Sequence, residues 1–190
     1  MTPAETWVAL VHHPVYDKNR RVVATALTNL DLHDIARATR TYGLAGFLVV
    51  HPVAAQRELA TRIAGHWLSD EGAEQNDFRR QAIERVAIVE TLEAAVAHVA
   101  ARAGRPPVRL ATCARPAENA LAFATARKIV DGPALIVLGT GWGLTDEILD
   151  GCERRLAPIQ AGSDYNHLSV RSACAIILDR LYGDREDYAP

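Results

Sequence analysis

Short apolar runs separated by amphipathic stretches dominate this chain of 190 residues. Runs of about four to eight apolar residues that end at a Pro, a Gly or a polar turn are typical of buried strands. The pattern predicts strands at 6–12, 46–51, 86–89, 108–112 and 134–138, with shorter extended segments at 22–27 and 156–159.

Between these runs, apolar residues recur every three or four positions, which is the spacing of one face of an α-helix. This spacing predicts helices at 32–42, 54–67, 78–83, 92–103, 116–130, 145–153 and 168–181. Asn29 or Asp31 is expected to cap the first helix and Gly43 to end it, because these residue types satisfy backbone groups at helix ends. The polar stretch 69–77 is predicted to be a loop.

Strands that alternate with helices in this way predict an α/β fold, a mostly parallel sheet with helices on both faces. Residues 1–183 are expected to form one domain and residues 184–190 a flexible tail. The longest apolar run, 134–139, is far shorter than the roughly 20 residues that span a bilayer. Since the N-terminus also lacks the pattern of a secretory signal, we expect a cytoplasmic protein.

Charge and cysteine content narrow the functional classes. The 21 basic and 23 acidic residues give a net charge of -2, which provides no global argument for nucleic-acid binding. Cys113, Cys152 and Cys174 show no CxxC spacing, so neither a disulfide framework nor a zinc site is predicted. His12 and His13 lie at the end of a strand without acidic partners at ligand spacing, and no metal site is predicted there.

A glycine-rich loop directly after the strand 134–138 is the most informative local feature. Its sequence places glycines at alternate positions, Gly139, Gly141 and Gly143, where backbone groups are expected to approach a ligand without obstruction by a Cβ atom. A dinucleotide-binding loop normally has the spacing GxGxxG at the first strand–helix turn, whereas this loop lies in the last third of the chain. A glycine turn needed only for tight packing is the alternative interpretation.

Three separated segments together resemble the SPOUT (SpoU–TrmD) class of S-adenosylmethionine-dependent RNA methyltransferases. Segment 28–50 is similar to the first motif of the class, with Asn29, Arg37 and Gly43 at its Asn, Arg and Gly positions. Segment 138–148 is similar to the second motif, and 156–178 to the third. The third motif's Pro, Gly, Asn and Ser positions are filled by Pro158, Gly162, Asn166 and Ser169. Within the class, the chain is most similar to a minimal stand-alone family over essentially its whole length.

The resemblance implies a deep trefoil knot in the C-terminal third, S-adenosylmethionine bound in that knot, and a homodimer that acts on RNA such as tRNA or rRNA. The residues then expected to bind the cofactor are Thr112, Cys113, Ala114, Arg115, Leu138, Gly139, Thr140, Gly141, Trp142, Gly143, Leu144, Ile159, Asn166, His167, Leu168 and Ser169. Catalytic roles are expected for Asn29, Asp34, Arg37, Asn166 and Ser169. RNA contacts are expected for Arg37, Arg40, Asn76, Arg79 and Arg80.

Some positions depart from the SpoU branch of the class. That branch usually has a Glu in the second motif where this chain has Gly141 or Trp142, and an Asn where this chain has His167. The resemblance therefore leaves the methylated atom open.

We predict S-adenosylmethionine-dependent methylation of RNA at an unidentified nucleotide. A non-catalytic RNA- or cofactor-binding protein on the same scaffold is the alternative, and an NAD-dependent oxidoreductase is a third function. Arg37 has two interpretations. It contacts a phosphate or the acceptor group, with Asp31 or Asp34 as orienter or base, or it forms a surface ion pair with Asp34.

Overall fold

Burial along the first strand shows how the sheet is built. In the computed structural model, which describes residues 1–183, all six residues of β1 (Thr6–Val11) are buried. Val8 and Leu10 pack into the core on one face of the sheet, and Trp7, Ala9 and Val11 pack into the core on the other. Because both faces are apolar, both must be covered by helices, as the sequence predicts.

Within residues 1–183, a seven-stranded sheet has the order β5-β4-β1-β8-β6-β9-β7, and its pairings are parallel. The other six strands are β4 (Gly46–Val50), β5 (Val86–Val89), β6 (Val108–Ala111), β7 (Ala120–Leu121), β8 (Ala134–Gly139) and β9 (Arg154–Leu156). A separate antiparallel hairpin consists of β2 (Val15–Tyr16) and β3 (Val22–Val23). The predicted α/β class and parallel sheet are confirmed, while the expected tail at 184–190 lies outside the described residues.

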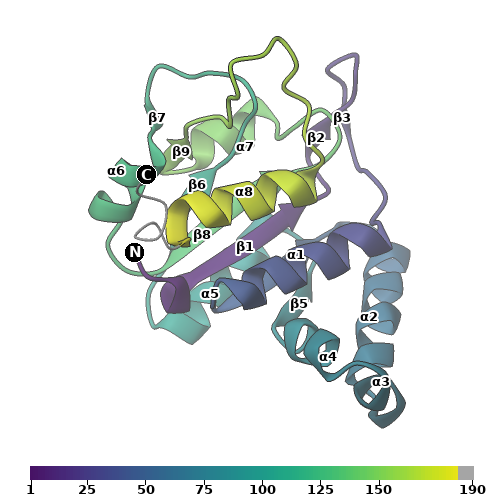
Figure 1. Ribbon diagram of the computed structural model, residues 1–190. Coiled ribbons are helices and arrows are strands. Elements are labelled where there is room, and N and C mark those ends of the chain that lie inside the picture. Colours follow the sequence, from purple (N-terminus) through teal and green to yellow (C-terminus); the bar gives the residue numbers. More distant parts are fainter. Residues whose placement is uncertain (184–190) are drawn as a thin grey trace.

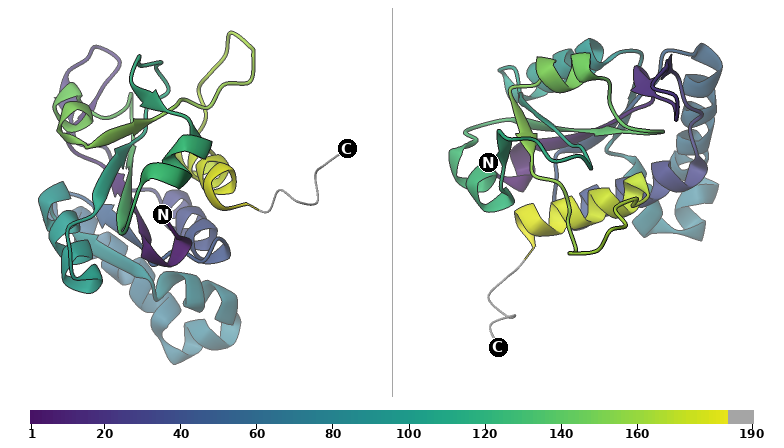
Figure 2. Two further views of the ribbon diagram at one scale, coloured as in Figure 1. Left: turned by 90° about the vertical axis from the view of Figure 1, so that its left-hand side faces the viewer. Right: turned by 90° about the horizontal axis from the view of Figure 1, so that it is seen from above.

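Helices form a layer on each side of the sheet (Figure 1, Figure 2). One layer contains α1 (Asn29–Thr41), α2 (Ala54–Leu68), α4 (Asp77–Ile83), α6 (Phe123–Ile129) and α8 (Val170–Tyr182). The other contains α5 (Leu92–Ala103) and α7 (Asp146–Gly151). The short helices η1 (Pro3–Glu5) and α3 (Asp70–Gln75) complete the described elements. None of the helices within residues 1–183 has both the length and the apolar composition needed to cross a membrane.

The first helix begins earlier than the sequence suggests. Thr28, rather than Asn29 or Asp31, caps α1, and its Oγ1 accepts a hydrogen bond from the backbone N–H of Asp31 at 3.1 Å. Asp31 donates to this cap from inside the first turn, where its negative charge also favours the positive end of the helix dipole. Gly43 follows the helix with a φ of +70°, as expected of a residue that ends a helix.

Two predicted segments are wrong. The stretch 69–77 contains α3, because Ser69 caps a helical turn by accepting from the N–H of Gly72 at 3.3 Å. The predicted helix 116–130 is helical only from Phe123, since β7 pairs with β9 at the sheet edge instead. Smaller differences are that 22–27 is a strand only at Val22–Val23, and that the extended segment expected at 156–159 is the strand Arg154–Leu156, which overlaps it only at Leu156.

Parallel strands bring their carboxyl ends to the same edge of the sheet. At this edge lie the segment 12–28 after β1, the segment 112–115 after β6, the glycine loop (residues 139–143) at the end of β8, and the segment 157–169 after β9. The fold therefore assembles four loops, which are far apart in sequence, around one position.

Candidate functional site

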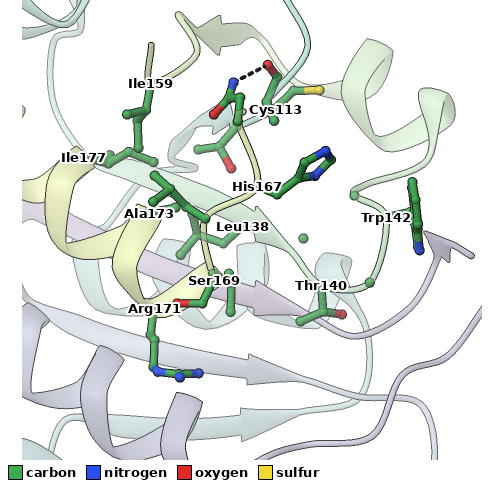
Figure 3. Close-up of a pocket in the computed structure, with 18 of the residues that line it drawn as sticks. Cys113, Leu138, Thr140, Trp142, Ile159, His167, Ser169, Arg171, Ala173 and Ile177 are labelled. Carbon is green, nitrogen blue, oxygen red and sulfur yellow. Dashed lines mark hydrogen bonds between the residues drawn. The ribbon is translucent and has the colours of Figure 1, made fainter. Parts of the chain in front are cut away.

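A pocket of about 670 Å³ lies among these four loops (Figure 3). This volume is within the range of about 300–1,000 Å³ that is typical of small-molecule sites. Its lining residues are Thr25, Ala26, Thr28, Asp31, Thr112, Cys113, Ala114, Arg115, Leu138, Gly139, Thr140, Gly141, Trp142, Gly143, Ala157, Pro158, Ile159, Asn166, His167, Leu168, Ser169, Val170, Arg171, Ala173 and Ile177.

The glycine loop is shaped by the β2–β3 hairpin. Tyr16 donates its N–H to the carbonyl of Gly143 and accepts from the N–H of Trp142, both at 2.9 Å. Gly141 has a φ of +59°, and a Cβ atom there would lie 2.9 Å from the carbonyl oxygen of Tyr16. The Cβ position of Gly141 is therefore occupied by the hairpin, and the expected approach of a ligand to this glycine stays a prediction.

One wall of the pocket is apolar. Figure 3 shows Leu138, Ile159, Ala173 and Ile177 directed toward one another from β8, from the segment after β9 and from α8. The opposite side is formed by Thr140 and Trp142 of the glycine loop. An apolar wall that faces a glycine loop suits a ligand with a flat, partly polar ring.

The segment 157–169 closes the pocket from the C-terminal side. Asn166 donates its side-chain N–H to the carbonyl of Ala114 at 3.1 Å, which joins this segment to the loop after β6. Ser169 caps α8 by accepting from the N–H of Ser172 at 3.3 Å. The ring of His167 makes edge contacts with Trp142 and Tyr165 at centroid distances of 6.4 and 5.4 Å.

A carboxylate and a guanidinium form the polar end of the pocket. Asp31 is 7% exposed and accepts from the hydroxyl of Thr28 at 2.6 Å and from Nη1 of Arg171 at 3.2 Å. Arg171 also lies 3.4 Å from the carboxylate of Asp34. Burying a carboxylate is costly unless it is paired and hydrogen-bonded, and here Arg171 supplies the ion pair and Thr28 a hydrogen bond.

A second charged group lies at the rim. The carboxylate of Asp146 accepts from Arg20 at 2.7 Å, from the hydroxyl of Tyr16 at 3.2 Å and from Arg115 at 3.3 Å. Burial acts to raise the pKa of Asp146, but the bonds from Arg115, Tyr16 and Arg20 outweigh it and hold that pKa below its usual value. The group joins the hairpin, the loop after β6 and the start of α7.

The predicted cofactor residues are brought together almost completely. Fifteen of the sixteen line the pocket, and the exception is Leu144, which is buried in the core below the glycine loop. Of the predicted catalytic residues, Asn166 and Ser169 line the pocket. Asn29, Asp34 and Arg37 lie on α1 outside the lining.

The structure also decides the pairing of Asp34. The surface ion pair between Asp34 and Arg37 is not formed, because Asp34 pairs with Arg171. Arg37 is exposed and has no ion-pair partner among residues 1–183. Sequence reasoning missed Arg171, since a helical Arg carries no signal of its partner, and it missed Thr28, which the pattern T-x-x-D of a helix cap could have indicated.

The predicted RNA-binding residues lie on α1 and before or within α4, outside the pocket lining. Asn76 caps α4, Arg79 stacks on the ring of Trp67 at 4.3 Å, and Arg80 forms ion pairs with Asp77 and Glu84. Arg40 lies 3.4 Å from the side-chain oxygen of Gln81. Asn76 and Arg80 thus have structural roles, and an RNA contact by either stays a prediction.

A model of the family described as SAM-dependent RNA methyltransferase matches residues 5–183. The chain belongs to this family. Its members use S-adenosylmethionine, and the observed site fits that cofactor: the pocket has the size of a ligand site, an apolar wall for a ring, and a glycine loop beside it. Among residues 1–183, no group of three or more His, Cys, Asp or Glu side chains is placed to hold a metal ion.

Two relatives are similar in sequence over nearly the whole chain. A tRNA (guanine-N(1)-)-methyltransferase of Nitratidesulfovibrio vulgaris is 44% identical over 178 residues, which is 94% of this chain and 42% of that protein. An uncharacterized protein of Aquifex aeolicus is 37% identical over 185 residues, 96% of this chain and 90% of that one. Because the chain spans less than half of the first relative, that protein's activity does not transfer directly.

Solved structures agree on the fold. A probable methyltransferase from Bordetella pertussis Tohama I has a TM-score of 0.61 at 20% identity and covers 94% of this chain and 95% of its own. A TrmH/SpoU tRNA modifying enzyme of A. aeolicus has a TM-score of 0.57 at 14% identity, over 98% of this chain and 77% of its own. At these identities the likeness concerns the fold alone.

Proposed function

We propose that this chain transfers the methyl group of S-adenosylmethionine to a nucleotide of RNA, in tRNA or rRNA. The main support for the proposal is that one pocket is lined by the glycine loop, by the apolar wall and by the ion pair between Asp31 and Arg171. The family supports the cofactor and the RNA substrate class. The name of the N. vulgaris relative supports a tRNA, and residues 1–183 would act as one methyltransferase domain.

The cofactor would lie between the apolar wall and the glycine loop. Leu138, Ile159 and Ile177 would contact its adenine ring. Those backbone groups of residues 139–143 and 166–169 that are not already bonded within the protein, as the N–H groups of Thr140, Trp142 and Gly143 are, would hydrogen-bond its polar groups. The bound cofactor supplies an electrophilic methyl group, which leaves the sulfonium as the acceptor forms its new bond. The protein has to align that acceptor and accept any proton it loses.

The polar end of the pocket would receive the acceptor nucleotide. Asn166 and Ser169 both line the pocket, and we assign them to orienting the acceptor group, Ser169 from the start of α8 beside Arg171 and Asn166 from its bond to the loop after β6. Asp31 lines this end and would accept a proton, and Asp34 would support it from α1 through Arg171. Asn29 is the first residue of α1, and its catalytic role stays a prediction. Arg37 and Arg40 would hold RNA phosphates on the exposed face of α1.

A symmetric dimer would complete the substrate surface. Trp142, Tyr165 and Leu168 are exposed by 65%, 72% and 47% beside the pocket, and such apolar groups favour contact with a partner. α1 and α8 pack side by side and would lie at or near the interface, so that one protomer's Arg37 can approach its partner's pocket. Light scattering should give about twice the chain mass of 20.7 kDa, and a monomer at micromolar concentration would contradict the dimer.

A trefoil knot is part of the same proposal. Asn166 joins the segment before α8 to the loop after β6, while the end of α8 returns to the start of the chain, where the hydroxyl of Tyr182 lies 2.7 Å from that of Thr6. An experimentally determined structure would test whether α8 passes through the preceding loop.

A non-catalytic binding protein is the second candidate, favoured by the pairing of Asp31 with Arg171, which leaves no unpaired base in the polar end. Calorimetric titration with S-adenosylhomocysteine tests the cofactor site, with NAD as the control ligand. Binding of the former alone supports the proposal, and binding of NAD alone contradicts it. Cofactor binding without transfer of labelled methyl groups to any RNA would favour the second candidate.

A further inference from the structure

Thr25, which lines the pocket, is held by two buried histidines that the proposed chemistry does not use. Its N–H donates to the carbonyl of His12 at 3.0 Å, and its carbonyl accepts from Nε2 of His51 at 2.8 Å. Its hydroxyl lies 3.1 Å from Nδ1 of His12 and 2.5 Å from the hydroxyl of Thr140. Every polar atom of Thr25 therefore has a partner, and these partners follow β1, β4 and β8.

The direction of these hydrogen bonds follows from counting hydrogens. The hydroxyl of Thr140 donates to the carbonyl of Val11 at 3.1 Å, so its oxygen must accept from Thr25. The oxygen of Thr25 then accepts from His12, which places the proton of that neutral ring on Nδ1. The N–H of Val53 donates to Nδ1 of His51, which leaves Nε2 of His51 as the donor to Thr25.

The environment of His12 keeps it neutral. Its side chain is fully buried, its ring stacks on that of His51 at 5.1 Å, and its Nε2 atom has no hydrogen-bond partner among the described residues. Burial and the nearby His51 lower the pKa of His12 to about 4, against the opposing influence of Asp31. A neutral, immobile ring with one committed donor can orient a hydroxyl but carries no charge to the pocket.

Thr25 lies between the glycine loop and the start of α1. Thr140 belongs to the glycine loop, which would hold the cofactor. Thr28, three residues after Thr25, caps α1 and hydrogen-bonds Asp31. The connecting segment is fixed further by the N–H of Leu27, which donates to the side chain of Gln56 at 2.8 Å. Thr25 thus links the cofactor side of the pocket to its acceptor side.

We infer that Thr25 is a positioning residue, held by His12 and His51, that sets the distance between the glycine loop and the start of α1. The inference rests on the proposed function for its effect on methyl transfer, but not for its effect on the structure. A misplacement of about 1 Å between reacting groups can lower a rate about 100-fold, so such a link has a large effect on catalysis.

Amide hydrogen exchange tests the link without any ligand. Thr25→Val removes the hydroxyl at nearly constant volume, Thr25→Ser keeps it, and Thr39→Val is the matched control. Thr39 is buried, whereas Thr25 is half-buried, and the hydroxyl of Thr39 donates to the carbonyl of Ala36 at 2.8 Å, away from the pocket. Thr25→Val should speed exchange in both 139–145 and 26–31 by roughly three- to tenfold, the effect of one lost hydrogen bond. Unchanged exchange in either segment, or an equal change in Thr39→Val, would overturn the inference.

Ligand binding and catalysis supply a second readout. With S-adenosylhomocysteine as probe, the Kd of Thr25→Val should rise less than about threefold, while methyl transfer to RNA falls at least about tenfold. Thr25→Ser should restore the rate. Equal losses in affinity and rate would overturn the inference. If the wild-type chain neither binds this probe nor transfers a methyl group, the proposed function fails and the exchange experiment still decides the link.

Discussion

The substitution Gly141→Ala tests whether the β2–β3 hairpin shapes the glycine loop. Gly141 has a φ of +59°, where an L-residue costs about 1–2 kcal/mol. The added Cβ would also lie 2.9 Å from the carbonyl oxygen of Tyr16 and 3.2 Å from Cγ2 of Thr25. To relieve this contact the hairpin must move away, which weakens the two hydrogen bonds of Tyr16 to the loop by about 1 kcal/mol in total.

We therefore expect Gly141→Ala to lower the free energy of unfolding by about 2–3 kcal/mol in urea. Gly104→Ala separates strain from contact, because Gly104 has a similar φ of +76° and nothing within 4 Å of its Cβ position. That control should lose only about 1–2 kcal/mol. The affinity for S-adenosylhomocysteine should fall in Gly141→Ala and remain unchanged in Gly104→Ala. Equal losses of stability in the two variants would refute the role of the hairpin.

Three further predictions concern charged and titratable groups. Burial lowers the pKa of His12 from 6.5 to about 4 in the folded chain. The free energy of unfolding should therefore be highest above pH 6.5 and fall by up to about 3 kcal/mol toward pH 4, because the unfolded chain binds the proton more tightly. Urea unfolding of His12→Asn should show a shallower pH dependence. Arg171→Ala should lower the free energy of unfolding by about 1–2 kcal/mol, since it leaves the buried Asp31 without its ion-pair partner. If the two side chains are coupled, the double variant with Asp31→Asn should recover part of that loss. Arg37→Ala should lower methyl transfer about 10²–10³-fold with less than about 1 kcal/mol of destabilisation, and full activity would remove Arg37 from the catalytic assignment.

The sequence predicts those parts of the fold that depend on local patterns. The strands at 46–50 and 86–89 and the helix 92–103 follow from uninterrupted apolar runs or regular spacing, and each is found within a residue of the expected bounds. The helix α3 and the strand β7 were missed. A capping serine determines the first, and pairing with β9, more than 30 residues away, determines the second.

The same distinction applies to the site. The glycine loop and the third motif can be recognised from their residue types and spacing. The residues predicted to bind the cofactor could therefore be assigned from the sequence. The pairing of Asp31 with Arg171 and the bonds that hold Thr25 join segments that lie 140 and 115 residues apart. No local pattern encodes such pairs, and only the packed structure brings them together.

Transfer of labelled methyl groups from S-adenosylmethionine to total RNA tests the central claim most directly. The RNA is taken from two strains, one that lacks the gene for this chain and one that has it. If the chain is an RNA methyltransferase, RNA from the first strain accepts label at a defined nucleotide and RNA from the second, already modified, accepts little. Absence of incorporation into either RNA by a chain that binds S-adenosylhomocysteine would contradict the account.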